Sequence, residues 1–224
     1  MTPGEMLPTD ERRSAERQIS VLINAGLLHS GRDALCRIRN LSTDGIMVET
    51  GLPLGVDDRV MLQLRSGRPV RGTVRWAEAG KAGIAFDDPR SAQWVTEKPM
   101  DHHLRASPIG YPLFRREAWA RVVVSTRQMR AKIVAISPVG VMVENDRDWG
   151  TEKVFTISIL GLGEHLARLV EGHSAIDPDQ GVMSFIFIQP LNYNALNEWL
   201  AETPRPEGED VNWDLGEDGP GDFS

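Results

Sequence analysis

The chain has 224 residues, of which 41% are hydrophobic, 25% charged and 6% aromatic. This is the composition of a folded globular protein, with room for one large domain or two of ordinary size. The formal net charge of −7 at pH 7 would by itself argue against a ligand that carries phosphates. However, residues 202–224 hold eight acidic residues and one basic residue, Arg205, so residues 1–201 sum to zero. The argument against anionic ligands therefore does not apply to the body of the chain.

Cysteine content and hydropathy exclude further classes of protein. Cys36 is the only cysteine, so neither an intrachain disulfide nor a cysteine-based metal site is possible. No segment approaches the roughly 18 consecutive apolar residues that a membrane-spanning helix needs. The apolar stretch 19–28 imitates a signal peptide, but acidic residues dilute the basic region before it and no small-residue cleavage site follows. We predict a cytoplasmic protein without a membrane span.

Alternation of apolar residues predicts short strands along most of the chain. In chain order the alternating segments are 19–23, 60–64, 70–76, 84–86, 122–124, 157–159 and 182–186. Glycine turns such as Asp44-Gly45 separate the earlier strands. We expect Trp76 to share a core-facing side with Val70 and Val74. Many short strands with glycine turns favour small antiparallel barrels.

A helical pattern closes each half of the chain. The first is a weak pattern at 91–97. The second, at 191–200, is stronger because Leu196, Trp199 and Leu200 form an apolar stripe. We therefore expect a mainly β protein with a short helix after each set of strands.

An internal repeat with an offset of 95 residues divides the chain. Residues 36–50 read CRIRNLSTDGIMVET and residues 131–145 read AKIVAISPVGVMVEN, with six of the fifteen positions identical. This period is too long for a solenoid and suits a duplicated domain. We predict four segments: a first domain at 9–98, a linker at 99–111, a second domain at 112–201 and a disordered acidic tail at 202–224.

Two short motifs in the first half carry the candidate chemistry. One is the R-x-x-x-R pattern of Arg13 and Arg17, which Arg12 precedes, and the other is Asn-Leu-Ser-Thr-Asp-Gly at 40–45. A guanidinium binds phosphate with two parallel hydrogen bonds and stacks on a purine. Asparagine offers a donor and an acceptor to a base edge, serine offers a hydroxyl, and glycine lets the backbone turn tightly or approach a ligand. These groups suit a guanine nucleotide with more than one phosphate.

Together with the later strand GTVRWAEAGKAGIAF, the two motifs resemble the PilZ domain family over residues 11–89. The resemblance implies a six-stranded antiparallel barrel that binds cyclic di-GMP, a bacterial second messenger. It implies that the arginines hold phosphates and guanines from an N-terminal segment, while the second motif contacts the ligand from the barrel. The ligand contacts implied in this way are Arg12, Arg13, Arg17, Asn40, Ser42 and Gly45.

The second half resembles a PilZ domain that has lost the site. Ala135 stands where Asn40 stands in the first half, and Pro138-Val139 replaces Thr43-Asp44. An alignment of Arg115-Arg116 with Arg12-Arg13 places Ala120 opposite Arg17, with Arg121 one residue later. Each lost charge-assisted hydrogen bond costs roughly 1.5–3 kcal/mol, so we expect weak or no nucleotide binding here.

These observations predict a bacterial cyclic di-GMP receptor in which the ligand orders the N-terminal segment and changes the surface or angle offered to a downstream protein. The second domain would serve partner contact, fixed geometry or homodimer formation. We expect no bound cofactor, no metal, no nucleic-acid polymer as a partner and no enzymatic activity, because no catalytic constellation is found. The alternative is a ligand-independent interaction adaptor built on two barrels.

Overall fold

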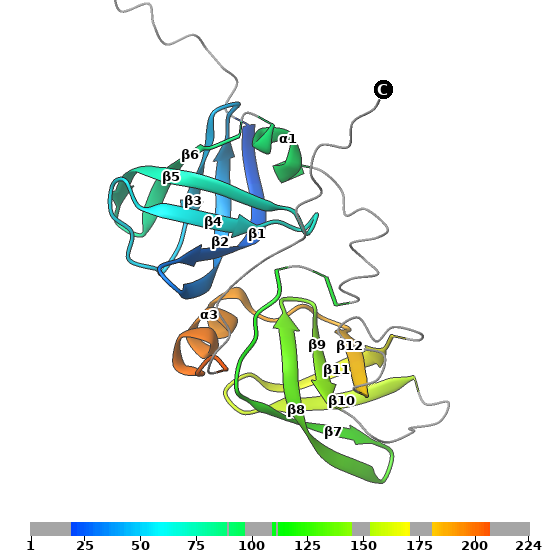
Figure 1. The fold of residues 1–224 in the computed structure, drawn as a ribbon. Helices are drawn as coiled ribbons and strands as arrows, with labels where there is room; N and C mark the ends of the chain where they lie inside the picture. Colours follow the sequence, from blue (N-terminus) through cyan, green and yellow to red (C-terminus); the bar gives the residue numbers. More distant parts are fainter. Residues whose placement is uncertain are drawn as a thin grey trace, which may run out of the picture.

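The computed structural model describes residues 19–88, 90–96, 109–110, 112–144, 153–170 and 181–206. Within them the chain forms two closed barrels, each with six antiparallel strands, and this confirms the predicted mainly β fold (Figure 1). The three N-terminal arginines of the first motif, residues 99–108 of the predicted linker and residues 207–224 of the predicted tail lie outside the described residues.

The first barrel has the strand order β1-β2-β3-β6-β5-β4, and β4 pairs with β1 to close it. Its strands are β1 (Ile19–His29), β2 (Arg32–Leu41), β3 (Gly45–Glu49), β4 (Arg59–Gln63), β5 (Pro69–Glu78) and β6 (Lys81–Phe86). Alternate residues of these strands fill a continuous apolar core, as the period of two requires. A short helix, α1 (Ser91–Thr96), follows and packs Val95 against this core.

The second barrel repeats this topology in the order β7-β8-β9-β12-β11-β10. Its strands are β7 (Trp119–Val124), β8 (Arg127–Ser137), β9 (Gly140–Glu144), β10 (Val154–Ile159), β11 (Gly163–Leu169) and β12 (Val182–Phe187). Helix α3 (Tyr193–Glu202) follows. Its N-cap is Asn192, whose side chain accepts hydrogen bonds from two backbone N–H groups of the first turn, so the helix begins after the apolar residue Leu191.

Strand register shows that the offset of 95 residues extends upstream of the repeated motif. Cys36 pairs with Ala25 in the first barrel, and the equivalent Ala131 pairs with Ala120 in the second. Ala120 therefore corresponds to Ala25, and the alignment of Ala120 with Arg17 is wrong. By the same offset, Arg115-Arg116 corresponds to residues 20–21 of β1 and not to the arginine motif.

Helix α3 lies between the two barrels (Figure 1) and holds the backbone of β2 at Leu35. The Leu35 N–H donates to Oδ1 of Asn197 at 2.9 Å, and the Leu35 carbonyl accepts from Nδ2 of Asn197 and from the Tyr193 hydroxyl, both at 3.0 Å. Burial raises the pKa of the Tyr193 phenol, which keeps this donor protonated. The Leu35 side chain belongs to the apolar core of the second barrel. The barrels therefore share a packed joint.

A buried ion pair completes the joint. Arg116 NH2 lies 2.6 Å from Oδ1 of Asp33, and the two side chains are only 2% and 4% exposed. The Arg116 guanidinium also donates to the carbonyl oxygens of Leu200 and Arg115. Arg116, which the sequence alignment had placed in a lost ligand site, instead connects the second barrel to β2 of the first.

Cys36 is expected to resist thiol reagents in the native protein. Its side chain is fully buried in the first barrel, and burial raises the pKa of the thiol to about 12. Because the thiolate is the reactive form, a maleimide at pH 8 should label the thiol only after unfolding in denaturant. Mass spectrometry of labelled native and unfolded protein measures this. Labelling of native Cys36 as fast as of an exposed cysteine would contradict the buried position.

Candidate functional site

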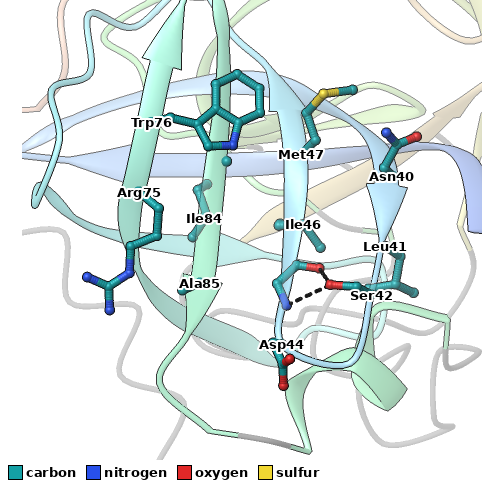
Figure 2. A pocket seen from close by; sticks show the side chains of 12 residues that line it. Asn40, Leu41, Ser42, Asp44, Ile46, Met47, Arg75, Trp76, Ile84 and Ala85 are labelled. Atoms are coloured by element: carbon teal, nitrogen blue, oxygen red, sulfur yellow. Dashed lines mark hydrogen bonds between the residues drawn. The ribbon is translucent and has the colours of Figure 1, made fainter. Parts of the chain in front are cut away.

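A pocket of about 300 Å³ opens on the outer surface of the first barrel (Figure 2). It lies where the end of β2, the β2–β3 turn and the start of β3 meet β5 and β6. Its lining includes Asn40, Ser42, Gly45, Met47, Arg75 and Trp76. The structure thus brings together the three predicted contacts of the second motif at one pocket.

The β2–β3 turn is held by the hydroxyl of Ser42. Ser42 Oγ lies 3.0 Å from the Gly45 carbonyl oxygen, to which it donates, and 3.2 Å from the Gly45 N–H, from which it accepts. The Ser42 N–H donates to the same carbonyl at 2.9 Å. The register between β2 and β3 shifts between Ile38 and Asn40, so that Asn40 pairs with Met47 at the pocket. Turn and bulge together place an amide and a hydroxyl along one wall (Figure 2).

Gly45 is required by packing rather than by a left-handed backbone. It is a strand residue paired with Ala85 of β6. A Cβ at this position would lie less than 3.0 Å from the carbonyl oxygen of Ile84, which is backbone and cannot rotate away. The glycine therefore lets β3 and β6 approach at the base of the pocket.

Trp76 lies on the outside of the barrel, and its predicted place in the core was wrong. The register between β5 and β6 shifts between Val74 and Trp76, which inserts one residue and turns Trp76 outward while Val74 stays buried. The indole is 43% exposed and lies against Gly83, where any Cβ would clash with the ring. An aromatic ring therefore lines the pocket beside Met47 (Figure 2).

Arg75, the residue inserted by this bulge, places a positive charge at the pocket. Its guanidinium lies 3.7 Å from a carboxylate oxygen of Asp57, and both side chains are more than half exposed. Such a long, exposed ion pair contributes little, so the guanidinium remains available to an anionic ligand. Sequence reasoning did not select Arg75 or Trp76, because only the bulge brings them to the pocket.

The start of β1 lies beside the same motif. Ile19 pairs with Leu41, and Ser20 pairs with Asn40. The segment that contains the R-x-x-x-R pattern ends two residues before Ile19, so it joins the barrel next to Asn40. The pairing thus places the first described residues of β1 beside Asn40 and Leu41 of the second motif.

Glu49 occupies the same position of the repeat as Glu144. Glu49 forms an ion pair with Arg39 at 2.7 Å, and the hydrogen bond from Arg39 lowers the pKa of the Glu49 carboxyl.

Among the residues that the structure describes, no three His, Cys, Asp or Glu side chains gather as metal ligands would. No helix in the same part of the chain is long and apolar enough to span a membrane.

Residues 11–98 match the family model of the PilZ domain. The match covers all six strands of the first barrel and α1, so the first barrel is a PilZ domain. It ends before the second barrel, which has the same strand order. No curated protein matches the chain.

Solved structures similar to the chain include three bacterial proteins. PlzA of Borreliella burgdorferi, solved in complex with c-di-GMP, is 10% identical with a TM-score of 0.34, over 82% of this chain and 92% of that one. The inhibitor of motility MotI of Bacillus subtilis is 13% identical with a TM-score of 0.33, over 82% and 96%. YcgR of Escherichia coli, also in complex with c-di-GMP, is 12% identical with a TM-score of 0.29, over 74% and 76%.

Proposed function

We propose that the protein is a receptor for cyclic di-GMP, which it binds at the pocket of the first barrel. One observation carries the proposal. The barrel that matches the PilZ family has an outer pocket at which Asn40, Ser42 and Gly45 meet, next to the start of β1. The pocket supplies polar groups, an aromatic face and a guanidinium, which suits a ligand that combines purines with phosphates.

Each group has a distinct role in this proposal. Arg13 and Arg17, with Arg12 beside them, bind the phosphates and stack on the guanines. The Asn40 amide and the Ser42 hydroxyl meet polar edges of the ligand, and Gly45 lets the backbone come close. From the opposite wall, Trp76 offers a stacking surface and Arg75 a further positive charge. No metal or additional cofactor is needed for this mode of binding.

The proposed output is a change at the surface of the first barrel. Ligand phosphates neutralise the arginines and hold the segment before β1 against the barrel, and a downstream protein recognises the altered surface. In this role the protein is a receptor in the cytoplasm and not an enzyme. A protein partner is expected rather than a nucleic-acid polymer.

Removal of either motif should abolish most of the binding. Isothermal titration calorimetry with cyclic di-GMP should give a clear heat of binding for the full chain. Arg13→Ala and Asn40→Ala should each weaken binding. Loss of one hydrogen bond to a charged group costs roughly 1.5–3 kcal/mol, so Arg13→Ala should raise the dissociation constant about 10- to 150-fold. Arg90→Ala is the matched control, since it removes an exposed arginine that pairs with Asp88 outside the pocket.

Equal heats for the wild type and both motif variants, at ligand concentrations up to high micromolar, would refute the proposed site. A stoichiometry that stays unchanged when the second barrel is mutated is also expected. If binding persists in Asn40→Ala but is lost in a variant of Ala135, the ligand site lies in the second barrel and not in the first.

A ligand-independent adaptor is the second candidate function, and an exposed apolar face of the second barrel favours it. Val154, Leu166, Ile186 and Ile188 are 39–55% exposed on the outer side of β10–β12 and at the end of β12. Such a face suits a protein partner or a second copy of the chain. Hydrogen exchange separates the two functions: a receptor shows ligand protection of residues 11–18, whereas an adaptor shows none.

A further inference from the structure

The offset of 95 residues allows the pocket of the first barrel to be compared with the same position in the second. Asn40, Ser42, Gly45 and Met47 correspond to Ala135, Ser137, Gly140 and Met142. The strand pairing supports this correspondence, because Asn40 is opposite Met47 in the first barrel and Ala135 is opposite Met142 in the second. In the first barrel this position is an open pocket.

In the second barrel the position is filled by Ile109. This residue precedes the barrel in the chain, and its side chain is completely buried in a cluster with Ala135 and Met142. Ser137 Oγ donates to the Ile109 carbonyl at 2.6 Å and accepts from the Val139 N–H at 3.1 Å. A Cβ at Gly140 would lie 2.9 Å from Cβ of Ile109. Ile109 thus touches or is clustered with the equivalents of all four pocket residues.

The change from Asn40 to Ala135 fits this occupant. An alanine leaves an apolar surface on which an isoleucine packs without burying an unpaired amide. The serine shared by the two halves donates to different partners: Ser42 to the carbonyl of Gly45 in its own turn, and Ser137 to the carbonyl of Ile109. The site therefore accepts a turn of the chain with an apolar side chain, and Ala135 offers no amide for a nucleotide where Asn40 stands in the first barrel.

The anchored segment also contacts the first barrel. The Leu113 N–H donates to Oε1 of the buried Gln63 in β4 at 2.8 Å. Three residues later, Arg116 forms the buried ion pair with Asp33 of β2. Between Ile109 and Arg116 the chain is thus held by the second barrel at one end and by the first barrel at two further points.

We propose that the second barrel uses the former ligand position as an anchoring site for the chain's own linker, and that Ile109 seated there keeps the two barrels at a fixed orientation. The second barrel is then a rigid platform for the first. Ligand-dependent changes are confined to the surface of the first barrel, and the angle between the barrels stays constant.

Distance measurement between spin labels tests the proposal on the full chain. One spin label is attached at Arg71→Cys in β5 and the other at Lys132→Cys in β8, and both positions are exposed. The native Cys36 is buried and should not take up label. Double electron–electron resonance should give one narrow distance distribution without any ligand. Ile109→Asp should broaden it at least twofold, because a carboxylate cannot occupy the apolar site. Leu160→Asp is the control, since Leu160 is 93% exposed, and it should leave the width unchanged.

Circular dichroism shows whether the variants fold, and Ile109→Ala provides a milder change if Ile109→Asp unfolds the second barrel. A broad distribution in the wild type, or a narrow one in folded Ile109→Asp and Ile109→Ala alike, would overturn the proposal.

The ligand-free measurement is independent of the proposed receptor function. When cyclic di-GMP is added and calorimetry shows binding, the distance should stay the same, and a shifted distance would also overturn the fixed orientation.

Discussion

Arg116→Met is expected to lower the free energy of unfolding by about 3–5 kcal/mol. The substitution keeps most of the side-chain volume but removes the charge that faces Asp33. The Asp33 carboxylate is then left buried without its partner, because its side chain is only 4% exposed in the wild type. The carbonyl of Leu200 in α3 loses its hydrogen bond from the guanidinium as well. Urea unfolding followed by circular dichroism measures the loss.

Two comparisons show whether burial causes this effect. Arg121→Met removes an exposed ion pair with Glu164, in which the side chains are 55% and 62% exposed, and should cost about 0–1 kcal/mol. The double variant Asp33→Leu with Arg116→Met removes both buried charges and should recover most of the lost stability. An Arg116→Met variant as stable as Arg121→Met would show that the pair does not hold the joint.

Gly45→Ala is expected to destabilise the first barrel by about 1–3 kcal/mol and to weaken cyclic di-GMP binding in parallel. The added methyl group has no room, because its position lies within 3.0 Å of the Ile84 carbonyl oxygen. To admit it, β3 must move away from β6, and this movement distorts the base of the pocket. Urea unfolding measures the stability, and calorimetry measures the binding.

Gly51→Ala is the matched control for this substitution. Nothing lies within 4 Å of a Cβ built at Gly51, so its effect should stay within about 0.5 kcal/mol. If Gly45→Ala proves as stable as Gly51→Ala, the strands at the pocket can separate without cost, and the packing explanation for Gly45 fails.

Local sequence patterns account for the parts of the structure that were predicted well. Alternation with a period of two reports directly which strand residues face a core, and Asp44-Gly45 marks a turn that needs no distant contact. The apolar stripe of Leu196, Trp199 and Leu200 likewise reports one face of a single helix, and all three are buried. Asn40, Ser42 and Gly45 meet at one pocket because they lie in one tight turn or in the strand ends beside it.

The errors arose where the pattern is interrupted. Trp76 follows Val74 by two residues, which places it on the inner face of a regular strand, but the extra residue Arg75 reverses its side. A bulge adds one residue to one strand only, so it is visible in the pairing with β6 and not in the apolar pattern. The misplaced alignment of Arg116 has a similar cause, since matching residue types do not reveal register.

The charge and sequence patterns by themselves predicted a mainly β chain with a duplicated unit and one candidate phosphate-binding motif near its N-terminal end. Only the tertiary structure showed that Ile109 packs on the second unit's copy of the 40–45 motif. Asp33 and Arg116 are 83 residues apart, and Ile109 reaches Ser137 across 28 residues. Such contacts depend on how barrels and linker pack together, and packing between distant segments leaves no periodic trace in the sequence.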